Sequence, residues 1–109
     1  MNREALPLRR LAETMQVSFA GEKYVLTKGY YPDGRIGEVF LDRIKDKTAS
    51  RLGYALDGVC RDSAMMLSLL LQHGATIQSI AHTVTRDDDN EPATVLGAIC
   101  DLLLKEERK

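Results

Sequence analysis

The stretch Tyr30-Tyr31-Pro32-Asp33-Gly34-Arg35-Ile36-Gly37-Glu38-Val39-Phe40-Leu41 decides the fold, because it places a turn between two apolar segments. Proline fixes the negative φ of a turn's second residue, and Asp-Gly supplies positions that tolerate unusual backbone angles. The flanking segments 24–31 and 36–42 are rich in aromatic and branched residues, which is typical of strands. Since so short a link joins antiparallel neighbours, the sequence predicts an antiparallel pair of strands here.

A further strand is predicted before this pair. Between Thr14 and Phe19 apolar residues alternate with polar ones, which is the pattern of a half-buried strand. The turn Ala20-Gly21-Glu22-Lys23 then leads into the next strand. We therefore expect a three-stranded antiparallel meander, and its apolar face needs a covering layer.

The second half of the chain predicts that covering layer. Apolar residues at helical spacing indicate a long helix over 50–73, and Gly74 is the expected left-handed stop. A shorter helix is predicted over 76–83, and a last helix begins after Thr94, which can cap it. The predicted inward stripe of the long helix consists of Leu52, Leu56, Val59, Ala64, Leu67 and Leu70. Segregated strands and helices in this order predict an α+β domain.

Length and composition fit one small domain. The chain has 109 residues, of which 44% are hydrophobic and 28% charged, and its formal net charge is −1. A protein held to nucleic acid mainly by charge needs a strong basic excess, so this class is disfavoured. No stretch has the pattern of a signal peptide or a membrane span, which predicts a cytoplasmic location. We expect an arm over 1–13, one domain over 14–104 and a charged tail over 105–109.

No complete catalytic or metal-binding pattern is present. The two cysteines and two histidines lack the spacing of a zinc site, so Cys60 and Cys100 are expected to be buried structural thiols. The acidic loop 86–92 lacks the glycine and the glutamate that a calcium loop requires. There is also no glycine-rich phosphate loop and no nucleophile elbow. The sequence thus predicts no catalytic residue, no metal and no cofactor.

The apolar run Met65-Met66-Leu67-Ser68-Leu69-Leu70-Leu71 surrounds the predicted long helix on all sides. A helix that is apolar all round has to be covered all round. Two explanations stay open: the last two helices complete the cover, or a second subunit does. In the second case the chain is a homo-oligomer, with Met65, Met66 and Leu69 as interface residues.

Arginines are the candidate binding residues. Arg9 and Arg10, flanked by leucines, can clamp a phosphate or a carboxylate, or the arm can be a loosely ordered tail. Arg35, Glu38 and Arg43 form a candidate recognition patch, whereas the alternative gives Pro32 to Arg35 a role in turn geometry alone. The candidate nucleotide-binding or partner-binding residues are therefore Arg9, Arg10, Arg35, Glu38 and Arg43.

The opening stretch, followed by Leu69-Leu70-Leu71-Gln72-His73-Gly74 and then Ile77, resembles the TSCPD domain. That domain occurs near the C-terminus of cobalamin-dependent, class II, ribonucleotide reductases. The resemblance covers residues 14–104, and small stand-alone bacterial members also share the entry Arg9-Arg10-Leu11-Ala12-Glu13-Thr14. The Ser-Cys-Pro-Asp string is absent from Pro92 to Cys100, so no role of its cysteine carries over. The resemblance implies a family label of ribonucleotide reductase without the catalytic barrel.

Three functional hypotheses follow. The first is a non-catalytic accessory or interaction module that self-associates. The second is a nucleotide or nucleic-acid binder that uses the arginines named above. The third is a subunit of a ribonucleoside-diphosphate reductase that is active only in complex with a reductase large chain. The expected partners are accordingly a second copy, a large chain or a nucleotide, and not a membrane.

Overall fold

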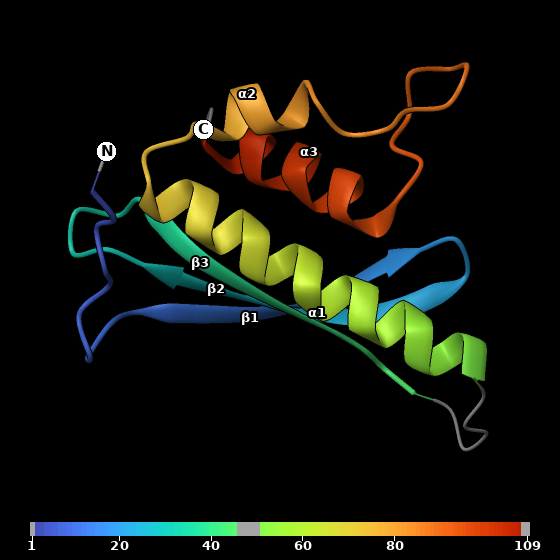
Figure 1. Ribbon diagram of the computed structural model, residues 1–109, viewed down its shortest axis with the longest axis horizontal. Helices are drawn as coiled ribbons and strands as arrows, with labels where there is room; N and C mark the ends of the chain where they lie inside the picture. The colour runs from blue at the N-terminus through green and yellow to red at the C-terminus, as the bar shows by residue number, and fades with distance from the viewer. Residues whose placement is uncertain (1, 46–50, 108–109) are drawn as a thin grey trace. The chain divides into compact units, whose positions relative to one another are not determined.

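The computed structural model describes residues 2–45 and 51–107 and has the predicted α+β architecture, a three-stranded antiparallel sheet followed by a long helix and two shorter ones (Figure 1). The elements are β1 (Ala12–Phe19), β2 (Glu22–Tyr30), β3 (Ile36–Arg43), α1 (Arg51–Gln72), α2 (Ile77–Ala81) and α3 (Val95–Glu107). Ser50, the predicted start of the long helix, lies outside the described residues, as do Met1 and the last two residues of the predicted tail. The chain divides into two compact units, Met1–Gly74 and Ala75–Lys109.

The sheet of the first unit has the order β1-β2-β3, with both neighbouring pairs antiparallel. Leu26 lies opposite Met15 of β1 and opposite Leu41 of β3, so these side chains share one face. Leu26 and Leu41 are buried, whereas Gln16 on the other face is exposed. The predicted meander is confirmed, and the alternation along each strand sets which face is apolar.

The turn between β2 and β3 has the predicted geometry. The amide of Gly34 donates to the carbonyl of Tyr31 (2.9 Å), which makes Pro32 the second residue of the turn. Gly34 has a φ of +95°, a backbone conformation that favours glycine. The Asp33 carboxylate accepts a hydrogen bond from the amide of Arg35 (3.1 Å) and stiffens the turn from inside.

The helix α1 runs along β3, one of the two edges of the sheet (Figure 1). The amide of Val39 donates to the Ser68 hydroxyl (2.9 Å), and the Gln72 side-chain amide donates to the carbonyl of Gly37 (2.9 Å). Both backbone groups would otherwise lack a strand partner. The helix ends as predicted before Gly74, whose φ is +96°. Polar side chains of α1 thus bond the outward backbone groups of Val39 and the carbonyl of Gly37 at this sheet edge.

The predicted inward stripe of α1 is only partly correct. Ala64 and Leu67 are buried, but Leu52, Val59 and Leu70 are 80%, 62% and 48% exposed. The reason is that the helix side facing the sheet edge carries polar residues, including Ser68, which hydrophobic spacing does not select. Much of the apolar surface of α1 therefore faces outward.

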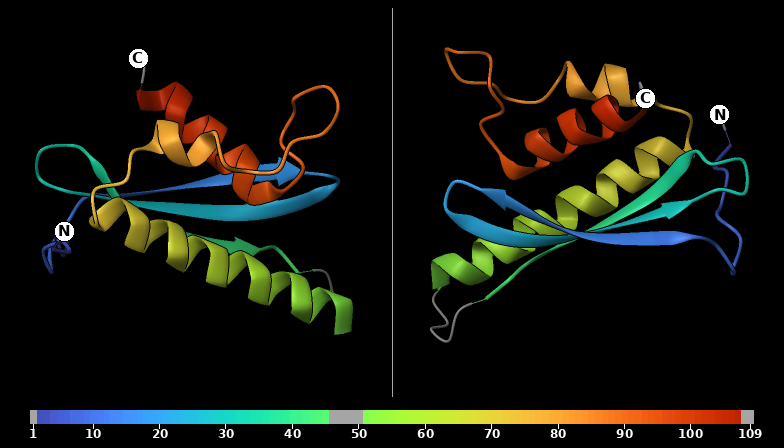
Figure 2. Two further views of the ribbon diagram at one scale, coloured as in Figure 1. Left: turned by 45° about the horizontal axis from the view of Figure 1, so that its top comes forward. Right: turned by 180° about the vertical axis from the view of Figure 1, so that it is seen from behind.

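The second unit contains α2 lying beside α3 (Figure 2). Thr76 caps α2 by accepting from the amide of Ser79 (3.1 Å), and Thr94 caps α3 by accepting from the amide of Gly97 (3.1 Å). The predicted cap of the last helix is thus confirmed. Ile99 and Leu103 of α3 are among the most buried residues of the chain.

Candidate functional site

The N-terminal arm is hydrogen-bonded to the remainder of the first unit. The alternative prediction, that the arm is a loosely ordered tail, is therefore wrong. The Nε of Arg3 donates to the side-chain oxygen of Gln72 (2.5 Å), and the Glu4 amide donates to the Gln72 carbonyl (2.8 Å). The Tyr31 hydroxyl donates to the Glu4 carbonyl, and burial raises the pKa of Tyr31. Gln72 therefore ties the arm, α1 and β3 together, a role that sequence spacing does not indicate.

Arg35 pairs with two carboxylates at the turn. Its guanidinium contacts both carboxylate oxygens of Glu4 (3.1 and 3.0 Å) and one oxygen of Asp33 (2.7 Å). It also lies over the ring of Tyr31, 4.6 Å from the centroid. Hydrogen bonds from the amide and guanidinium of Arg35 lower the pKa of Asp33. The turn arginine is thus paired within the chain.

Glu38 pairs with Arg10 and not with Arg35. The Nε and one terminal nitrogen of Arg10 reach the two carboxylate oxygens of Glu38 (2.6 and 3.1 Å). Gly29, opposite Glu38 in the register, makes room for this side chain, because a Cβ at Gly29 would lie 2.6 Å from Cγ of Glu38. Two candidate residues from distant positions therefore meet, and a glycine on β2 allows it.

Arg43 belongs to a separate cluster, at the other end of β3 from the turn. Its Nε donates to Asp57 of α1 (2.9 Å), and one terminal nitrogen lies 3.4 Å from Glu22. Burial alone raises the pKa of Asp57, but the hydrogen bonds and charges of Arg43 and Lys45 together outweigh burial, so the pKa is lowered. Arg10, Arg35 and Glu38 thus gather near the turn, Arg43 does not join them, and Arg9 is exposed.

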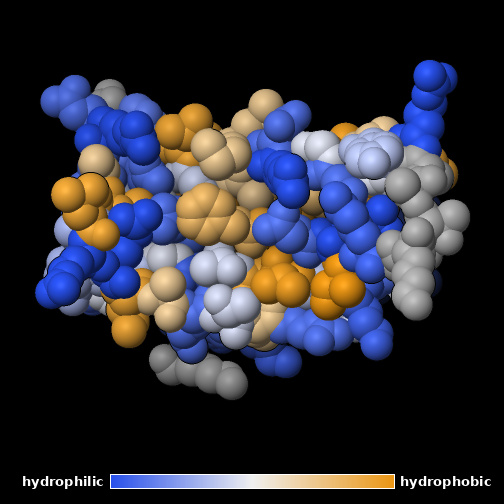
Figure 3. Space-filling view, turned by 90° about the horizontal axis from the view of Figure 1, so that it is seen from below, coloured by the Kyte–Doolittle hydropathy of each residue, from blue (hydrophilic) through white to orange (hydrophobic). Residues whose placement is uncertain are grey.

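Met65, Met66 and Leu69, the candidate interface residues, are 54%, 65% and 43% exposed. They lie on the same helix as the exposed residues Leu52, Val59 and Leu70. We call this set the outer face of α1, and it consists of Leu52, Val59, Met65, Met66, Leu69 and Leu70. Apolar side chains also form patches between hydrophilic ones on the molecular surface seen in Figure 3. The outer face of α1 is the largest group of exposed apolar side chains on a single described element.

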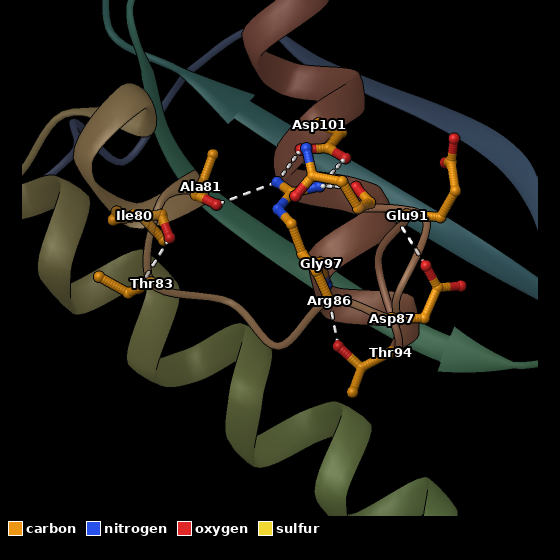
Figure 4. A network of polar contacts seen from close by, with 10 residues as sticks. Ile80, Ala81, Thr83, Arg86, Asp87, Glu91, Thr94, Gly97 and Asp101 are labelled. Atoms are coloured by element: carbon orange, nitrogen blue, oxygen red, sulfur yellow. Dashed lines mark hydrogen bonds and ion pairs between the residues drawn. The ribbon is translucent and has the colours of Figure 1, made fainter.

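The acidic loop of the second unit is organised by its own side chains (Figure 4). Arg86 forms a two-point pair with Asp101 of α3 (2.7 and 3.0 Å) and donates to the Ala81 carbonyl (3.0 Å). Hydrogen bonds from Arg86 lower the pKa of Asp101. Asp87 accepts from the amides of Asp89 (2.9 Å) and Glu91 (3.0 Å), so its carboxylate holds the loop together.

Residues 2–45 and 51–107, which the structure describes, contain neither a metal-binding cluster nor a helix that could cross a membrane. Within these ranges, no group of three or more His, Cys, Asp and Glu side chains is placed to hold a metal ion. A bilayer crossing needs a longer apolar helix than any found there. Cys60 and Cys100 are buried free thiols, and burial raises the pKa of Cys100 to about 11.

Comparison with known proteins gives one consistent set of relatives. The chain is 35% identical over 83 residues to the vitamin B12-dependent ribonucleotide reductase of Agrobacterium fabrum, a match that covers 76% of this chain and 6% of the relative. The enzymes of the same name from Bradyrhizobium diazoefficiens and Rhodopirellula baltica are 36% and 34% identical, over 83% and 73% of this chain and 7% of each relative. No family model and no solved structure matches. Over most of its length the chain is therefore homologous to one short region of vitamin B12-dependent ribonucleotide reductases.

Proposed function

We propose that the chain is a non-catalytic interaction module of a vitamin B12-dependent ribonucleotide reductase system, corresponding to the TSCPD domain. In this proposal it docks on a reductase large chain through the outer face of α1, for which the sequence suggested a second copy as the partner. It also self-associates. Its proposed place of action is the cytoplasm, and two free, buried cysteines are compatible with such a reducing compartment.

The exposed outer face of α1 is the observation that carries the proposal. Leu52, Val59 and Met66 repeat every seven residues, so they lie on the same side of the helix, and Leu70 continues that side. An apolar patch of this kind on a small protein marks an interaction site, because exposed apolar surface is costly in water. Methionine suits such a surface, since its flexible side chain adapts to different partners.

The relatives supply the class of partner. Each is a protein named vitamin B12-dependent ribonucleotide reductase, and the matched region is 6–7% of its length. In those proteins the region is joined to the remainder of a reductase chain. A reductase large chain is therefore the partner that the sequence similarity favours.

Nucleotide binding is the second candidate function, because the candidate arginines already form ion pairs within the chain. Arg10, Arg35 and Arg43 each contact a carboxylate within the chain, so a phosphate would have to compete with these carboxylates for the guanidinium groups. Fluorescence anisotropy with labelled nucleotides and single-stranded DNA at low salt distinguishes the two functions. Binding that weakens steeply with added salt would favour the nucleotide-binding function.

Affinity purification tests the docking proposal. The tagged chain is expected to co-purify the reductase large chain from its native cell, as identified by mass spectrometry. Met66→Glu places a charge on the outer face of α1 and is expected to abolish co-purification, whereas Gln78→Glu, a charge added at an exposed position of α2, is expected to preserve it. Absence of the large chain from the wild-type sample, or equal recovery with Met66→Glu, would contradict the proposal.

A further inference from the structure

The two edges of the sheet differ in whether their outward backbone groups have hydrogen-bond partners. β2 lies between β1 and β3, so β1 and β3 are the edges, and Ser68 of α1 bonds the outer backbone of β3. At the start of β1, the Leu11 carbonyl accepts from the amide of Tyr30 (2.9 Å), so the odd-numbered residues of β1 direct their backbone groups toward β2. The backbone groups of the even-numbered residues, Ala12, Thr14, Gln16 and Ser18, consequently point to the outer edge.

The outer edge of β1 lacks the usual protection against pairing. Natural sheet edges are blunted by lysine, proline, bulges or short strands. β1 spans eight residues, Ala12–Phe19, and pairs with β2 along all of them without a register shift. It contains no lysine and no proline, and its only charged residue is Glu13. Within the described part of the chain, no backbone hydrogen bond is formed at this outer edge.

The sequence of β1 is self-complementary when two copies run antiparallel about a twofold axis at Gln16. Thr14 then lies opposite Ser18 of the partner subunit, and Met15 lies opposite Val17 of the partner subunit. Cross-strand pairs of hydroxyl residues and of apolar residues stabilise sheets, whereas like charges directly opposite each other destabilise them. Glu13 lies opposite Phe19 of the partner subunit, so the acid meets no like charge.

We propose that a second copy of this chain pairs with β1, strand against strand, so that the two sheets become one continuous sheet. Main-chain hydrogen bonds hold such an added strand, as in other proteins that bind through a free sheet edge. Met15 and Val17 lie on the same face as buried Leu26 and Leu41, so the junction extends the apolar face of each sheet. The inference rests on the self-association in the proposed function and gives it a surface separate from the outer face of α1.

A charge-swap experiment at the twofold axis tests the pairing. The wild-type chain is expected to show a monomer–dimer equilibrium in sedimentation velocity. Gln16→Lys and Gln16→Glu each bring like charges together at the axis and are expected to weaken dimerisation about tenfold or more. An equimolar mixture of the two variants places Lys opposite Glu and is expected to restore the dimer. Gln78→Lys, the same change at an exposed position of α2, is expected to dimerise like the wild type.

The experiments distinguish failure of the β1 pairing from failure of self-association or of docking on the reductase chain. A wild-type chain that stays monomeric at all concentrations, Gln16 variants that dimerise normally, or a mixture that stays monomeric would each overturn the β1 pairing. If Met66→Glu dissociates the dimer and Gln16→Lys does not, self-association stands and the β1 interface is wrong. If the mixture restores the dimer but no reductase chain co-purifies, the β1 pairing holds and the docking proposal fails.

Discussion

The hydroxyl oxygen of Ser68 lies 2.9 Å from the amide nitrogen of Val39 and 3.1 Å from its carbonyl oxygen. Both residues are buried. One helix side chain thereby takes the place that a neighbouring strand would occupy at the edge of β3. This contact fixes α1 against the sheet and leaves the apolar residues on the other side of the helix exposed.

Ser68→Ala is expected to lower the free energy of unfolding by about 1–3 kcal/mol, because the buried amide of Val39 loses its acceptor. Urea denaturation followed by circular dichroism measures the change. Ser63→Ala, a half-buried serine on the same helix, is the matched control. If Ser68→Ala is as stable as this control, the hydroxyl does not secure the edge of β3.

Gly37→Ala is expected to destabilise the fold by about 1–3 kcal/mol through overpacking. A Cβ at Gly37 would lie 2.6 Å from the buried ring of Tyr31 and 3.0 Å from Leu6. Gly58→Ala in α1 meets nothing within 4 Å and is expected to stabilise the fold by about 0.5–1 kcal/mol. Thermal denaturation that shows the two substitutions with the same sign would refute this packing.

The Asp57–Arg43 pair predicts how stability depends on pH. The pKa of Asp57 is lowered in the folded state, so the pair stabilises the fold above the ordinary aspartate pKa of about 4, and this contribution is lost as the pH falls through the lowered value. Asp57→Asn is therefore expected to be less stable than the wild type at neutral pH, and the difference is expected to shrink in acid. Denaturation at a series of pH values measures it.

Asp62→Asn, a change at an exposed position of the same helix, is the control for that series. It is expected to follow the wild-type curve closely. A stability difference between Asp57→Asn and the wild type that stays constant down to strongly acidic pH would show that the charge of Asp57 contributes nothing.

The two thiols are expected to be unreactive in the folded protein. With a pKa of about 11, Cys100 is only about one part in a thousand thiolate at pH 8, and burial also raises the pKa of Cys60. Ellman's reagent is therefore expected to label neither thiol until urea unfolds the chain. Rapid labelling of either thiol before unfolding would contradict their burial.

Local sequence chemistry was sufficient for several features of the fold. Pro32, Asp33 and Gly34 predict the turn because their backbone preferences act within four residues. Gly74 and Thr94 predict helix ends for the same reason, and alternation predicts the sheet. These signals need no knowledge of what packs against them.

The features that the sequence did not reveal depend on tertiary contacts. Leu52 and Val59 have the spacing of inward residues, yet they are exposed because α1 faces the sheet edge with polar residues such as Ser68. The Arg10–Glu38 pair joins residues 28 positions apart, and nothing in local spacing selects Arg10 over Arg35 as the partner of Glu38. The exposure of these leucine and valine side chains and the choice of ion-pair partner both depend on the position of β3 relative to α1 and the N-terminal arm. No short sequence motif encodes that position.

Binding between purified components tests the central claim, that the chain acts by docking on a reductase chain through α1. The tagged chain is immobilised, and a purified vitamin B12-dependent ribonucleotide reductase large chain is titrated in biolayer interferometry. Saturable binding is expected, weakened about tenfold or more by Met66→Glu and unchanged by Gln78→Glu, since 1.4 kcal/mol corresponds to tenfold in affinity. Absence of saturable binding, or equal affinity of the wild type and Met66→Glu, would contradict the account.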